Sequence, residues 1–204
     1  MRFQHVVVVS VAVIITACSI GRPIPTATTY SIEPRAPAAD TAKPLRPERL
    51  RVERVRIAAP YDSTALVYRL SAVHYVSDPY HAFLAEPGPM LSNRIAGWLA
   101  AAELFKAVDG PGGVAPAPWV LEATVTELYG DFEATGDNPA AVMTIRFTII
   151  DEGGARPKVA YERTLSRRAP VSSASAEALV VGYGTALGDI LAQFASDLSN
   201  STLQ

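Results

Sequence analysis

Cysteine and histidine, the residues that most often carry chemistry, are scarce in this sequence. The 204 residues contain one Cys, Cys18, and three His. His74 and His81 lie seven residues apart, with no Cys near them and no HExxH-like pair. Metal sites usually need more ligands at closer spacing, so we expect no metal. Asp131 and Glu133 lie in a stretch with Gly, Asn and Pro, which favours an exposed turn over an acid/base pair. No nucleophile-elbow or Walker A motif occurs, and we expect no enzyme.

Cys18 follows a short apolar N-terminus with the three parts of a secretory signal. Arg2 gives the basic start, an apolar stretch runs from Val6 to Ile15, and two small residues precede the cysteine. Ten helical residues rise about 15 Å, half the thickness of a bilayer's hydrocarbon core, which is too short for a permanent span. We therefore predict that residues 1–17 are a cleaved signal peptide and that the mature protein is exported.

The cysteine itself has the setting of an acylation site. Ile15-Thr16-Ala17-Cys18 resembles the bacterial lipobox, whose usual form is Leu, a small residue, Gly or Ala, then Cys. An exported protein with one Cys cannot form an internal disulfide, and a free thiol in an oxidising compartment calls for a reason. We expect a diacylglycerol on the sulfur of Cys18; the alternative is a plain signal peptide with a chance cysteine. Ser19, which is not the Asp that retains such proteins at the inner membrane, favours the periplasmic face of the outer membrane.

The elements behind this N-terminus are those of one globular domain. Apolar residues make up 49% of the chain, charged residues 19%, and the net charge is −2, a composition that indicates a packed core and no nucleic-acid partner. Residues 18–48 hold six of the sixteen prolines and predict an extended tether, within which residues 28–32 are a candidate edge strand. We place the folded domain at residues 49–199 and a tail at 200–204.

Alternation of apolar and polar residues predicts a mostly antiparallel sheet. Two long segments alternate, at residues 119–126 and 141–149, and a hairpin-like turn leads to a third strand at 159–165. An earlier segment, residues 65–76, is rich in β-branched and aromatic side chains. We expect the strand signal there to end at Asp78-Pro79.

Helical spacing of apolar residues predicts two amphipathic helices, at residues 91–105 and 175–198. Gly182, Gly184 and Gly188 lie inside the second helix, where each costs about 1 kcal/mol relative to Ala, so we expect them to permit close approach of another element. Packing within the monomer is favoured over a subunit interface of a homo-oligomer. The predicted fold is α+β, a mostly antiparallel sheet covered on one face by two amphipathic helices.

The block of residues 56–108 resembles a known family. An aliphatic-Tyr-Arg strand leads to a tyrosine-rich segment, and an aromatic, a small residue and a Pro then precede an amphipathic helix. These places read Val67-Tyr68-Arg69, Tyr75, Tyr80, Phe83, Ala85, Pro87 and Phe105. Residues 121–132, "LEATVTELYGDF", and the Ala-rich last helix are also similar. In this order the features resemble the ABC-type transport auxiliary lipoproteins, the PqiC-like proteins.

The resemblance implies a role in transport rather than catalysis. Such lipoproteins work with an MCE (mammalian cell entry) protein and an ABC permease and ATPase to move phospholipids or other hydrophobic molecules between the inner and outer membranes. No cofactor is implied beyond the lipid on Cys18, which attaches the protein to the membrane. A lipid-binding carrier domain and a structural envelope lipoprotein are the alternatives.

Three residues are the candidate docking surface for the partner. Tyr80, Phe83 and Leu84 lie among prolines on an expected loop, and aromatic side chains on rigid loops are common interface anchors. The alternative is that these side chains fold back over the domain's own core.

Overall fold

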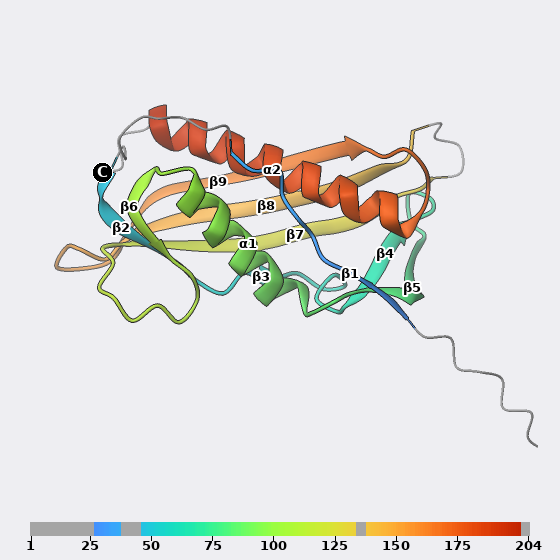
Figure 1. Cartoon of the computed structure of the whole chain (residues 1–204), viewed down its shortest axis with the longest axis horizontal. Helices are drawn as coiled ribbons and strands as arrows, with labels where there is room; N and C mark the ends of the chain where they lie inside the picture. Colours follow the sequence, from blue (N-terminus) through green and yellow to red (C-terminus); the bar gives the residue numbers. More distant parts are fainter. Residues whose placement is uncertain (1–26, 38–45, 134–137, 201–204) are drawn as a thin grey trace, which may run out of the picture.

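The computed structural model describes residues 27–37, 46–133 and 138–200. Their elements in chain order are β1 (Thr28–Tyr30), β2 (Arg46–Val52), β3 (Arg56–Ile57), β4 (Ala65–Arg69), β5 (Tyr75–Phe83), α1 (Pro87–Ala101), β6 (Phe105–Asp109), β7 (Trp119–Asp131), β8 (Ala140–Asp151), β9 (Lys158–Pro170) and α2 (Ala176–Asn200). Figure 1 shows both helices packed on one side of an elongated sheet. The predicted α+β class is confirmed.

β7 is the strand around which the sheet is built. β8 pairs with it in antiparallel orientation along its length, and β9 pairs with β8 in the same way. Along its other edge β7 receives three short strands in succession, all parallel: β2 near Trp119, β3 near Thr124 and β4 near Gly130. β6 extends the sheet beyond β2, and β5 and then β1 extend it beyond β4. The long ladders are antiparallel as predicted, whereas the short parallel pairings are not predictable from alternation alone.

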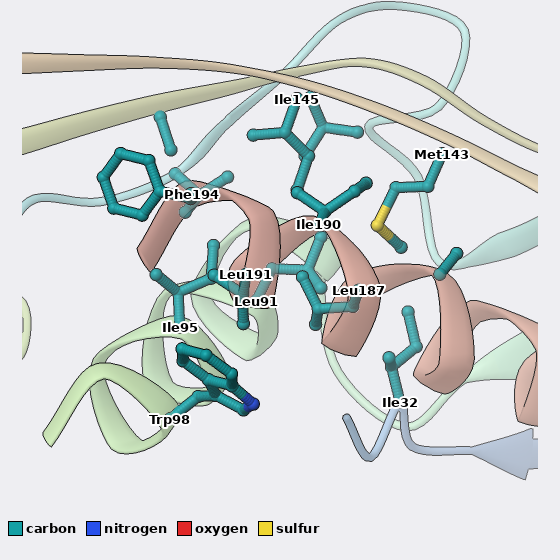
Figure 2. Close-up of a cluster of buried hydrophobic side chains, with 14 of the residues drawn as sticks. Ile32, Leu91, Ile95, Trp98, Met143, Ile145, Leu187, Ile190, Leu191 and Phe194 are labelled. Atoms are coloured by element: carbon teal, nitrogen blue, oxygen red, sulfur yellow. The ribbon is translucent and has the colours of Figure 1, made fainter. Parts of the chain in front are cut away.

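The core lies between the sheet and the two helices. Phe147 of β8 and Phe194 of α2 stack with their ring centroids 4.4 Å apart. Figure 2 shows the surrounding layer of buried side chains: Ile32, Leu91, Ile95, Trp98, Met143, Ile145, Leu187, Ile190, Leu191 and Phe194. Burial of each such side chain contributes about 1.5–3 kcal/mol. α2 has the length and composition of a membrane span, but 61% of its most apolar window is buried inside the fold, as in a core helix.

Residues 31–35 form a strap that packs on both helices, between α1 and α2. Ile32 is fully buried in the core. From α1, Trp98 Nε1 donates to the carbonyl of Arg35 over 2.7 Å, and Arg94 Nε donates to the carbonyl of Ile32 over 3.1 Å. These contacts supply hydrogen-bond partners for the backbone of a segment that belongs to no helix or strand and contains Pro34.

The glycines of α2 make room for this strap. A Cβ at Gly184 would lie 2.3 Å from the carbonyl oxygen of Glu33, and one at Gly188 would lie 3.2 Å from the backbone nitrogen of Arg35. A Cβ at Gly182 would instead lie 2.5 Å from a side-chain carbon of Val171 and 2.8 Å from the Cβ of Ala141 in β8. The predicted close approach is confirmed, and it occurs within the monomer.

The folded part of the chain begins earlier than the predicted boundary at residue 49. β1 falls within the candidate edge strand at 28–32 and pairs with β5 in parallel, with Thr28 opposite His81. The strap follows it directly, and β2 begins at Arg46. Residues 27–37, expected to be part of the tether, are therefore packed on the domain, because extended proline-containing chain can fill a groove without forming a helix.

β5 differs from the prediction because it continues through Asp78-Pro79. Ala65 pairs with Ala82 and Val67 with Ser77, so that β5 advances five residues while β4 advances two. The extra residues form a bulge. Proline is tolerated at a bulge, since its missing N–H is not needed by the ladder.

α1 has the predicted length but lies four residues earlier, from Pro87 to Ala101, because the chain leaves the helix after Ala101. Glu103 has φ +53°, the left-handed conformation that commonly ends a helix, and Phe105 then begins β6. Phe105 is buried in the same core as the apolar face of α1. Its helical spacing therefore reflects a shared core and not a continuous helix.

Candidate functional site

Exposed apolar side chains gather on the hairpin arm, residues 65–84, which comprises β4, β5 and the turn between them. The described part of the chain has seven large hydrophobic residues with substantial exposure, and four of them belong to this arm: Val73, Tyr75, Tyr80 and Leu84. Clustered exposed apolar side chains are typical of interaction surfaces, whereas single ones are ordinary. The hairpin arm is therefore the candidate functional site.

The three predicted docking residues separate into two classes. Tyr80 is 52% exposed and Leu84 is 69% exposed. Phe83 is only 4% exposed, and its ring lies 6.1 Å from that of Tyr183 on α2. Tyr80 and Phe83 belong to β5 and not to a loop, so the register of the strand decides which side chains face the core. A docking role for Phe83 is not compatible with this burial, and Tyr80 and Leu84 remain as the exposed pair.

Asp78 fixes the backbone that presents Tyr80. Its Oδ1 accepts hydrogen bonds from the backbone N–H groups of Tyr80, over 2.7 Å, and His81, over 3.1 Å. Its Oδ2 accepts the Tyr68 hydroxyl and lies 2.7 Å from His81 Nδ1, which carries the proton in that contact. Burial alone would raise the pKa of Asp78, but these hydrogen bonds outweigh it and lower the pKa below its usual value. The carboxylate thus stays charged and rigidifies the bulge.

An open hollow of about 490 Å³ lies between this network and the start of α2. Tyr68 and Phe132 stack in its wall with ring centroids 5.1 Å apart. Burial, followed by the contact with Asp78, raises the pKa of Tyr68, so that its hydroxyl remains a proton donor. Both oxygens of Asp78 are already engaged by neighbouring groups, and the arrangement is that of a structural network and not of an acid/base site.

Asp131 joins the hairpin arm to the rest of the sheet. Arg69 of β4 donates to it through Nε and Nη2, over 3.0 and 2.7 Å, and Arg168 of β9 pairs with the same carboxylate. Burial alone would raise the pKa of Asp131, but the two arginines hold it below its usual value. The predicted exposed turn is wrong here, because Asp131 ends β7 and is 4% exposed, while Glu133 follows in the loop. The Arg69 guanidinium also lies 5.4 Å above the ring of Tyr129.

The remaining candidate residues do not come together in one site. His81 belongs to the Asp78 network, and His74 is exposed in the turn of the hairpin arm. Within residues 27–37, 46–133 and 138–200, no group of three or more His, Cys, Asp or Glu side chains could hold a metal ion. Cys18, the predicted lipidation site, lies outside the described residues. The sequence analysis did not select Val73. The signal that could have found it is an apolar β-branched residue in the short turn between two strands.

Comparison with known proteins identifies a family. A model of the family described as "ABC-type transport auxiliary lipoprotein component" matches residues 30–195 of the chain. No curated protein is significantly similar in sequence.

Three solved structures share the fold. Protein XCC0632 from Xanthomonas campestris, of the family DUF330, is 18% identical, with a TM-score of 0.73 over 85% of this chain and 97% of that one. An uncharacterised protein is 18% identical, with a TM-score of 0.60 over 86% of this chain and 97% of the other. The hypothetical protein CT253 from Chlamydia trachomatis is 11% identical, with a TM-score of 0.52 over 76% and 96%. At such identities the likeness shows the fold alone.

Proposed function

Because the chain belongs to the family of ABC-type transport auxiliary lipoprotein components, we propose that it is the auxiliary lipoprotein of an MCE-type ABC system. The observation that carries the proposal is the extent of the family match, which runs from β1 to α2 and so includes nearly all of the described domain. The system's ATPase, permease and MCE protein move phospholipids or other hydrophobic molecules between the inner and outer membranes. This chain carries no Walker A motif. Its proposed contribution is to bind the MCE protein while it is anchored to the membrane.

The proposed mechanism has an anchor and a docking surface. Acylated Cys18 holds the domain at the periplasmic face of the outer membrane, since two or three acyl chains anchor a protein stably. Tyr80 and Leu84 bind the end of the MCE protein that faces this membrane. Their exposure and the hydrogen bonds of Asp78 to the β5 bulge support this assignment, because a rigid aromatic anchor loses little conformational entropy on binding.

The packing of the domain supports an adaptor over a lipid carrier. A carrier would hold an acyl chain between the sheet and the helices, but the stacked rings of Phe147 and Phe194 occupy that space together with the side chains of Figure 2. The hollow beside Asp78, of about 490 Å³, opens at the surface and has polar groups in its wall. Native mass spectrometry after gentle extraction distinguishes the two, since a carrier would retain a noncovalent lipid and an adaptor would not.

Co-purification tests the docking surface. The double variant Tyr80→Asp with Leu84→Asp should lose the MCE protein of the same organism from a tagged pull-down, because a charge cannot be buried in an apolar contact. Val114→Asp is the matched control, since Val114 is 99% exposed in the loop between β6 and β7. Equal recovery of the MCE protein with both variants would overturn the assignment of this surface.

Mass analysis tests the anchor. Wild-type protein should carry an acylated Cys18 as its first residue, whereas Cys18→Ala should remain unprocessed and lack the acyl mass. An unacylated wild-type chain would argue for the plain signal peptide and against the anchored function.

A further inference from the structure

The turn of the hairpin arm exposes an apolar side chain that the fold does not use. Two backbone hydrogen bonds close the turn, from Leu70 N–H to the His74 carbonyl over 2.8 Å and from His74 N–H to the Ser71 carbonyl over 3.3 Å. Val73 lies within it and is 90% exposed. Turns favour Gly, Asn, Asp, Ser and Pro, each for a backbone reason that a β-branched residue does not offer. The fold leaves this valine free for a contact outside the domain.

The neighbours of Val73 give the turn an amphipathic character. No acidic or basic residue other than His74 occurs in residues 70–77. Tyr75 is 39% exposed, and its ring packs edge-on against Tyr129 at 5.5 Å. A tyrosine with an apolar body and a polar tip suits the boundary between lipid headgroups and acyl chains, where Tyr and Trp are enriched.

The turn lies on the side of the sheet toward which the N-terminal end of β1 points. β1 runs parallel to β5 with Thr28 opposite His81, so its N-terminal end points toward the start of β5, which is the side of the turn. Figure 1 shows β1 starting at the same end of the molecule as the hairpin of β4 and β5. The loop between β6 and β7, which contains Val114, lies at the opposite end.

The chain length between the anchor and the domain allows contact. Thr28 lies ten positions after Cys18, a separation of at most about 35 Å when the chain is extended. His81 lies eight positions after Val73, a separation of at most about 28 Å. Acyl chains on Cys18 can therefore lie in a bilayer whose surface the turn touches.

We propose that the turn at residues 71–75 rests on the lipid surface to which the protein is anchored and orients the domain on it. The inference rests on the proposed acyl anchor at Cys18. A lipid surface is favoured over a protein partner for this turn, because one exposed valine and a half-exposed tyrosine offer far less area than the roughly 800 Å² per partner of a stable protein interface. A turn that only orients an already anchored domain needs little area.

A fluorescent label at the turn tests this contact. Val73→Cys and Val114→Cys are made in the full chain, each labelled with an environment-sensitive fluorophore, and the acylated proteins are reconstituted in vesicles of phosphatidylethanolamine with a minority of phosphatidylglycerol. Acylation blocks Cys18, so only the introduced thiol reacts. We expect a blue shift and quenching by spin-labelled lipid at position 73, and neither at position 114, whose valine is equally exposed on the far end of the domain.

Each outcome decides the proposal. A label at position 73 that stays in water in vesicle-bound, acylated protein would overturn the lipid contact and leave the proposed function standing. A shift at position 73 that requires added MCE protein would assign the turn to a protein partner and likewise overturn it. A mass showing unmodified Cys18 would remove the anchor, and the proposed function and this inference would fall together.

Discussion

β7 carries two very different neighbours along its length. On one side β8 and β9 follow in two long antiparallel ladders, and α2 covers them with buried aromatic and aliphatic side chains. On the other side the hairpin arm joins β7 through two paired positions, Tyr68 with Gly130 and Arg69 with Asp131. The ladder half holds the stacked rings of Phe147 and Phe194, whereas the hairpin arm holds four of the seven exposed large hydrophobic side chains in the described part of the chain. In this fold the most deeply packed region and the proposed contact surface lie in separate parts of the same sheet.

Truncating the ladder half should have the largest effect. Phe147→Ala removes a fully buried ring that stacks on Phe194, and it should lower the free energy of unfolding by about 3–5 kcal/mol. Urea denaturation measures the change. Val159→Ala on the exposed side of β9 is the control, expected within about 0.5 kcal/mol. A small loss at Phe147 would break the comparison, because the ladder half would then not be the stable part.

Crowding the contact between α2 and the strap should have the next largest effect on stability. Gly184→Ala places a Cβ against the Glu33 carbonyl and should destabilise by about 1–3 kcal/mol, because backbone must move. Gly97→Ala on the exposed face of α1 meets no atom within 4 Å and should stabilise by about 0.5–1 kcal/mol through helix propensity. Thermal unfolding of the two variants should therefore shift in opposite directions. Stabilisation by both would show that the strap is not held on α2.

Removing the charge that joins the two parts should loosen the hairpin arm selectively. Asp131→Asn weakens the hydrogen bonds from Arg69 and Arg168 and should cost about 2 kcal/mol. Amide hydrogen exchange should accelerate in β4 and β5 more than in β8. Glu133→Gln removes the same charge two residues later and serves as the control. Uniform acceleration over both parts would show that they open together.

The same carboxylate makes stability depend on pH. The pKa of Asp131 is lowered in the folded state, so the unfolded chain binds the proton first as pH falls. The contribution of Asp131 is therefore complete above the ordinary carboxyl pKa of about 4 and is lost as pH falls through the lower folded value. The stability difference between wild type and Asp131→Asn should shrink in that acid range. A difference that is constant with pH would contradict the charged pairing.

Changing the exposed face of the hairpin arm should have the smallest effect on stability. Tyr80→Asp with Leu84→Asp should leave the free energy of unfolding within about 0.5 kcal/mol per site, because neither side chain is buried. Denaturation of this variant beside wild type checks the value. A large loss would mean that these side chains support the fold, and the loss of partner binding could then not be read as loss of a contact.

The long elements could be predicted from the sequence, and the short ones could not. In β8 and α2 the apolar residues recur with one period over many residues, and such a long repeat is a strong signal for a strand or a helix. β3 has two residues and β6 has five, too few for a period, and both form because the edges of β7 and β2 are free to receive them. The parallel pairings of β2, β3 and β4 with β7 depend on how the intervening chain is routed back to the sheet. That routing is a property of the whole fold and not of any one segment.

The candidate site was predictable only in part for a related reason. Aromatic residues near proline predicted a contact surface, but alternation along β5 decides that Tyr80 is exposed and that Phe83 is buried. Asp131 still belongs to β7, five residues before Gly136, and its arginine partners come from β4 and β9, far away in sequence. The glycines of α2 predicted a close approach correctly, although the sequence does not say that the strap makes it.

The arrangement of β1 on β5 determines how the domain responds to tension. A pull on the N-terminus acts along the axis of β1 and loads its three paired positions with β5 in shear, all at once, instead of peeling them one by one. Behind β1, the buried Ile32 and the Trp98–Arg35 hydrogen bond resist the sliding of the strap. Mechanical force that enters through β1 is thus shared between β5, α1 and the core.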